Sequence, residues 1–98
     1  MRKGAEKMEL EELRNSLNES EKALAENFKE YMLIASALAE YGHENGVSVS
    51  SLAEENERLK EALKGTDAYL RPYMEEFLST VFALSGAFRS EIIDDLED

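Results

Sequence analysis

The chain has 98 residues, which is enough for one helical domain and too few for a second independent core. It contains no Cys, so disulfides, thiolate metal sites and a Cys nucleophile are excluded. The 22 acidic and 11 basic residues give a formal net charge of −11, which disfavours direct binding to nucleic acid or anionic lipid. No apolar run follows the basic start, so we expect neither a signal peptide nor a membrane span. We therefore expect the protein to be intracellular and cytoplasmic.

Helix-forming residues dominate the composition, and Pro occurs once. This balance predicts an all-α fold, arranged as a single helical domain over residues 1–98. The expected elements are a helix over about 5–41, a turn over 42–50, a helix over about 51–64, a kink or break over 65–72, and a helix over about 73–95.

The first predicted helix carries apolar residues at alternating steps of three and four, the spacing of a helix that packs along another helix. This first seam comprises Leu10, Leu13, Leu17, Ser20, Leu24, Asn27, Tyr31, Ile34, Leu38 and Tyr41. Around residues 10–17 the other faces are charged, so this end is expected to face solvent or a partner. From residue 23 the apolar face widens, and one neighbouring helix cannot cover it.

The clearest break in the sequence lies between Gly42 and Gly46, because glycines permit the positive φ angles that end a helix. Ser51 and Glu54 then form an S-x-x-E capping box, which predicts the start of the next helix.

The seam restarts at Leu52 and keeps its register through Gly65 and Pro72. This second seam comprises Leu52, Asn56, Leu59, Leu63, Thr66, Leu70, Tyr73, Phe77, Thr80, Leu84 and Ala87. Either Gly65 ends a helix and Thr66 or Asp67 caps a third one, or a single long helix continues with a kink near Pro72. The unbroken register favours the kinked helix.

The two seams together predict a long antiparallel helical hairpin closed at Gly42–Gly46. Two helices alone bury too little apolar surface to offset the cost of ordering the chain. We therefore expect dimerisation to complete a helical bundle. Asn27 and Asn56 are candidates for fixing the register by pairing inside that bundle, and an exposed position at the seam edge is the equal alternative.

The inventory of catalytic residues is thin. His43 is the only histidine, and a solvated loop position is its expected environment. Glu40 and His43 have the E-x-x-H spacing of di-iron sites, but Gly42 lies inside the motif and the helix is expected to end there, so we predict no metal and no cofactor. No phosphate-binding loop, nucleophile elbow or facing carboxylate pair occurs, and the chain is predicted not to be an enzyme.

A basic cluster stands out in this acidic chain, consisting of Arg58, Lys60, Lys64 and Arg71. Glu54 with Arg58 and Glu61 with Lys64 have the spacing of ion pairs along one helix. A self-neutralised helix face is therefore favoured over an anchor for an acidic partner.

The predicted function is a non-enzymatic helical protein–protein interaction or scaffold module, an acidic adaptor acting as a homo-oligomer. Its expected partners are a second copy of itself and another protein. The candidate interaction residues are Leu10, Leu13, Leu17, Leu24, Tyr31, Leu59, Leu63, Arg58, Lys60, Lys64 and Arg71.

Two alternatives stay open. Over residues 24–93 a long helix, the turn at Gly42–Gly46 and a Pro-kinked helix resemble the helical hairpin of BAR domains. The resemblance implies a membrane-associated scaffold with a basic face, for which only Arg58 to Arg71 are suitable, and the chain departs from the family in its acidic charge and in lacking a further long helix. The other alternative is an acidic inhibitor that imitates nucleic acid, although its carboxylates are scattered among Lys and Arg.

Overall fold

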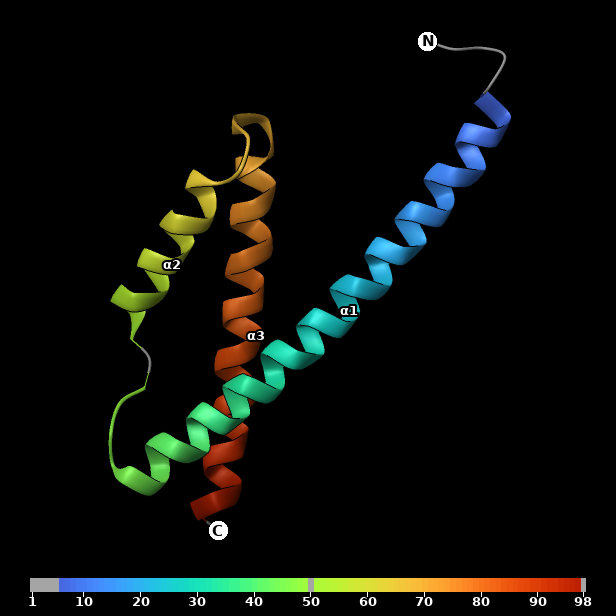
Figure 1. The fold of residues 1–98 in the computed structure, drawn as a ribbon. Helices are drawn as coiled ribbons and strands as arrows, with labels where there is room; N and C mark the ends of the chain where they lie inside the picture. The colour runs from blue at the N-terminus through green and yellow to red at the C-terminus, as the bar shows by residue number, and fades with distance from the viewer. Residues whose placement is uncertain (1–5, 50, 98) are drawn as a thin grey trace. The chain divides into compact units, whose positions relative to one another are not determined.

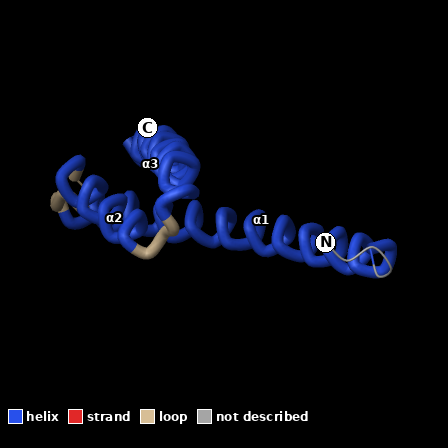
Figure 2. The backbone as a smooth tube through the Cα atoms, turned by 90° about the horizontal axis from the view of Figure 1, so that it is seen from above, coloured by secondary structure: helices blue, strands red, loops and turns tan. Residues whose placement is uncertain are grey.

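Three α-helices and one short 3-10 helix make up the described part of the chain (Figure 1). The computed structural model describes residues 6–49 and 51–97, and for residues 6–8 it describes the backbone alone. In chain order the elements are α1 (Glu6–Asn45), α2 (Leu52–Lys64), η1 (Ala68–Leu70) and α3 (Arg71–Glu97). No strand occurs in the two described ranges, and Figure 2 shows helices joined by short loops. The predicted all-α class is confirmed.

The end of α1 is set by Gly46. Gly46 has a φ of 63°, and the Val47 N–H donates to the Gly42 carbonyl at 3.0 Å. This bond between the C″ amide and the C3 carbonyl belongs to the Schellman motif, which satisfies carbonyls left open at a helix end. The Asn45 side-chain amide also donates to the Tyr41 carbonyl at 2.9 Å. α1 therefore continues to Asn45, past its predicted end at residue 41.

Gly42 lies inside α1, which corrects the prediction that it opens the turn. Its backbone is buried, and a Cβ atom there would lie 2.8 Å from the Val47 carbonyl oxygen and 3.2 Å from Val49 Cγ1. The two glycines thus serve different needs: Gly46 supplies the positive φ, and Gly42 lets the following chain return closely along the helix.

The predicted capping box at the start of α2 is confirmed on its Ser51 side. Ser51 is the N-cap in an extended conformation, and its hydroxyl accepts from the Glu54 N–H at 3.2 Å. Glu54 and Glu55 lie in the first turn of α2 and Lys64 in its last turn, so both ends match the helix dipole.

Between α2 and α3 the helix is broken, so the favoured continuous, kinked helix is wrong and the alternative of a third helix is correct. Gly65 caps the C-terminus of α2, and Asp67 occupies the N-cap position of η1 without a capping hydrogen bond from its side chain. Pro72 is the second residue of α3, where its missing N–H costs no intrahelical bond. Nε of Arg71 donates to the Leu63 carbonyl at 3.2 Å and the Thr66 carbonyl at 3.0 Å, which fastens this corner.

The chain divides into two compact units, which we call the N-terminal unit (residues 1–31) and the C-terminal unit (residues 32–98). In its described residues, the N-terminal unit is the first part of α1. The C-terminal unit holds the last part of α1 together with α2, η1 and α3.

In the C-terminal unit, α2 and α3 pack side by side and run antiparallel (Figure 1). This hairpin closes over residues 65–70. The predicted hairpin of two long helices closed at Gly42–Gly46 stays a prediction. The last turn of α1 lies beside the end of α3, where Nε2 of His43 is 3.7 Å from Oε2 of Glu97.

The core of the C-terminal unit is built from small side chains. Among residues with described side chains, the buried ones are Ala35, Ala39, Gly42, Val81 and Ser85. None is larger than valine, so these stretches of α1 and α3 bury little apolar area per residue. No helix in the described ranges is long and apolar enough to cross a lipid bilayer.

Candidate interaction surfaces

The predicted first seam is not the buried face of α1 in the C-terminal unit. Ile34, Leu38 and Tyr41 are exposed, whereas Ala35 and Ala39 on the adjoining face are buried. Each buried alanine follows a seam residue by one position, which rotates it by about 100° around the helix. The buried face of α1 is therefore the neighbouring stripe of small residues. The large side chains of the seam remain on the surface.

α3 repeats this pattern. Val81 and Ser85 are buried, and Ser85 is only 2% exposed. The seam residues on the adjoining face stay exposed, including Tyr73 at 74% and Phe77 at 49%. The outer face of α3 comprises Leu70 of η1 with Tyr73, Phe77, Thr80, Leu84 and Ala87. Within the C-terminal unit this stripe is largely apolar and exposed.

On α2 the second seam does face its neighbour. Leu59 and Leu63 are half-buried, as expected for the side of α2 that packs on α3. A shallow groove between the two helices is lined by Leu52, Glu55, Asn56, Leu59, Ser79, Phe82, Ala83 and Gly86. Of the predicted interaction residues, these two leucines therefore serve the internal packing of the hairpin.

The four predicted leucines of the N-terminal unit lie on one face of α1. Leu10, Leu13, Leu17 and Leu24 are all exposed, Leu13 to 67%. Tyr31, the last residue of this unit, is half-buried.

All four side chains of the predicted basic cluster contact other groups of the same chain. The ion pair of Lys64 with Glu61 forms at 3.3 Å, and Lys60 Nζ lies 3.6 Å from Glu57 Oε1. The Arg58 guanidinium stands over the Phe82 ring, 5.4 Å from its centroid, and so ties α2 to α3. Arg71 donates to backbone carbonyls at the α2–α3 corner, as described above. The predicted Glu61–Lys64 pair is thus confirmed, whereas Arg58 contacts Phe82 on α3 and not the predicted Glu54.

Arg89 is a site residue that sequence reasoning missed. Its side chain is 19% exposed, Nε donates to the Ser85 carbonyl at 3.3 Å, and an Nη atom lies 3.5 Å from Oε2 of Glu55 on α2. The signal was a single basic residue directly after the mostly apolar run 81–88 of α3. Because Arg89 and Glu55 are both largely buried, the pair links the two helices across the hairpin.

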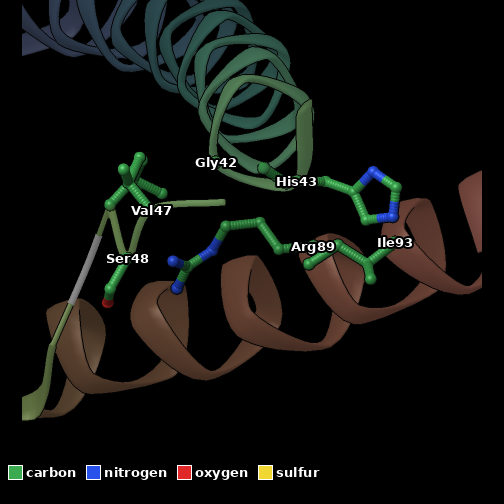
Figure 3. A pocket seen from close by; sticks show the side chains of 8 residues that line it. Gly42, His43, Val47, Ser48, Arg89 and Ile93 are labelled. Atoms are coloured by element: carbon green, nitrogen blue, oxygen red, sulfur yellow. The ribbon is translucent and has the colours of Figure 1, made fainter. Parts of the chain in front are cut away.

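A small pocket of about 280 Å³ adjoins Arg89 (Figure 3). It is formed by the end of α1, the following loop and α3, and is lined by Ala39, Gly42, His43, Val47, Ser48, Val49, Arg89 and Ile93. The one Arg in this pocket already bonds to Glu55 and Ser85. Glu40 and His43 belong to no cluster of three metal-ligating side chains within the described residues.

Comparisons with known proteins give no family assignment: no protein-family model, curated protein or solved structure matches the chain.

Proposed function

We propose that this chain is a non-enzymatic protein–protein interaction module that acts as a homo-oligomer through its helices. The observation that carries the proposal is the distribution of apolar side chains. Within the described residues the buried positions hold small side chains, while leucines and aromatic residues lie exposed in stripes along α1 and α3. Exposed apolar stripes of this extent mark interaction surfaces.

The proposed dimer completes a helical bundle by covering apolar stripes that the single chain leaves open. Its self-association supplies burial that a core of small residues lacks, and so offsets the entropy lost on ordering the helices. The remaining stripe, such as the outer face of α3, then binds another protein in the manner of an adaptor. We propose an intracellular, cytoplasmic location for this module, as expected from the sequence.

Sedimentation of the full chain from micromolar to near-millimolar concentration tests this proposal. We expect the weight-average mass to rise from that of the monomer to that of the dimer, with far-UV circular dichroism reporting helix at both ends of the range. A monomer mass throughout would refute self-association. A monomer mass together with less exposed apolar surface than the structure shows would instead indicate that the two units of one chain cover each other.

A further inference from the structure

We infer that residues 10–31 of α1 pair with the same residues of a second copy of this chain as a parallel, in-register coiled coil. The inference rests on the proposed function, because it names the interface and the geometry of that self-association.

The shape of the stripe indicates a single helix as its occupant. Leu10, Leu13, Leu17 and Leu24 are exposed and share one face of α1. Of the positions between them, all but Ala23 are polar or charged, so the stripe is narrow. A narrow stripe at heptad spacing is covered by one partner helix, whereas a broad face needs several.

The polar residues of the stripe select its orientation. In heptad notation the a positions are Leu10, Leu17, Leu24 and Tyr31, and the d positions are Leu13, Ser20 and Asn27. In a parallel, in-register pair each position meets itself, so Ser20 faces Ser20 and Asn27 faces Asn27, where their side chains can hydrogen-bond.

Antiparallel pairing lacks this match. There an a position faces a d position of the partner, and every a position in residues 10–31 is Leu or Tyr. Ser20 and Asn27 would then face large apolar or aromatic side chains in every register, which leaves the Ser20 hydroxyl and the Asn27 amide without a partner across the interface. A parallel pair shifted by one heptad keeps one polar match and loses the other. Ser20 of one copy then faces Asn27, but the second Ser20 faces Leu13 and the second Asn27 lies outside the stripe.

The flanking charges agree with the parallel arrangement. In a parallel pair a g residue lies near the e residue of the next heptad on the partner, which places Glu9 near Arg14 with opposite charges. The next such pairs are Ser16 with Glu21 and Ala23 with Phe28. No like charges meet along this interface, even though the whole chain carries a charge of −11.

Disulfide trapping in the full chain tests this geometry, because the chain has no native Cys. Ser20→Cys places a thiol on the seam with little change in size, and Lys22→Cys places one at an outward f position of the same heptad as a matched control. Under mild oxidation at a concentration where the mass is that of a dimer, we expect Ser20→Cys to form the covalent dimer about tenfold faster than Lys22→Cys, because only facing thiols reach disulfide geometry.

Mixing Leu13→Cys with Leu24→Cys distinguishes the orientations. These two positions face each other in the antiparallel register that places all four leucines of each copy in the interface. In a parallel, in-register pair they lie about 16 Å apart along the helix axis. Preferential formation of the mixed disulfide would overturn the inference. A dimer in which Ser20→Cys and Lys22→Cys oxidise at the same slow rate would also overturn it while leaving self-association intact, and a monomer mass would remove the proposed function as well.

Discussion

Residues 6–31 and residues 32–97 both form helices with a heptad seam, yet the structure uses that seam differently in the two regions. In the N-terminal unit the leucines of the seam are the apolar face, and they lie open along a helix with polar flanks. In the C-terminal unit the large seam residues of α1 and α3 are also open, but a second stripe of small residues beside each seam is buried. Where apolar residues form one stripe, the periodicity identifies the interface. Where they surround a helix, packing chooses which stripe is buried, and small residues allow the closest approach.

The largest expected effect comes from placing a charge on the narrow stripe of the N-terminal unit. Leu17→Asp should weaken self-association by about 3 kcal/mol, roughly a hundredfold in the dimer dissociation constant, because it desolvates an unpaired carboxylate in each copy. Sedimentation measures the change. Asn15→Asp adds the same charge at the outward f position and should leave the dissociation constant within about threefold. Equal effects of both variants would mean that net charge, and not the stripe, controls association.

The buried small-residue stripe of the C-terminal unit can be broken by enlarging it. Ala39 is 3% exposed, so Ala39→Leu should lower the free energy of unfolding by about 2 kcal/mol through overpacking. Ala37→Leu makes the same change at an exposed position of α1 and should shift that free energy by no more than about 0.5 kcal/mol. Urea denaturation followed by circular dichroism gives both values. A harmless Ala39→Leu would show that this stripe is not tightly packed.

Two helical glycines give a smaller contrast of opposite sign. A Cβ at Gly42 meets backbone at 2.8 Å, so Gly42→Ala should destabilise the chain by about 1 kcal/mol after its gain in helix propensity. At Gly86 the nearest group is the end of the Arg89 side chain at 3.9 Å, so Gly86→Ala should stabilise by about 0.5–1 kcal/mol. Thermal unfolding of the two variants side by side checks the signs, and stabilisation by both would remove the role assigned to Gly42.

The smallest effect on stability is expected on the outer face of α3. Tyr73 is 74% exposed, so Tyr73→Ala should change the free energy of unfolding of the monomer by no more than about 0.5 kcal/mol. Urea denaturation at concentrations where sedimentation gives the monomer mass measures it. A loss comparable with that of Ala39→Leu would mean that Tyr73 is covered in the folded monomer.

Local signals explain which predictions held. The capping box at Ser51, the Glu61–Lys64 pair and the helical class depend on residues within one turn of each other, so they are readable in the sequence. The prediction of one continuous, kinked helix through Gly65–Leu70 was wrong, because it relied on a heptad register that is unbroken there. Register constrains only which positions share a face of a continuous helix, and Gly65 and Pro72 had already signalled an end and a start.

Two features could not be predicted from local signals: the need for a glycine at position 42 inside α1, and the ion pair of Arg89 with Glu55. Gly42 is required by Val47 and Val49 returning along the helix, and Arg89 by a carboxylate 34 residues earlier in the chain. Both depend on the path of the chain after a turn, which no spacing of neighbouring residues encodes.

Residue types and their periodicity, taken alone, determined that this protein is helical, where α2 begins, and which stripe of residues 10–24 is apolar. Those properties follow from hydrogen bonds and side-chain spacing within a helix. The tertiary structure decided which face of α1 and α3 is buried in the C-terminal unit, because each helix offered a stripe of large side chains and a neighbouring stripe that includes small ones. It placed Ala35, Ala39, Val81 and Ser85 inside and left the larger seam residues outside. Close packing favours surfaces that approach closely, and hydrophobicity by itself does not distinguish between two apolar faces.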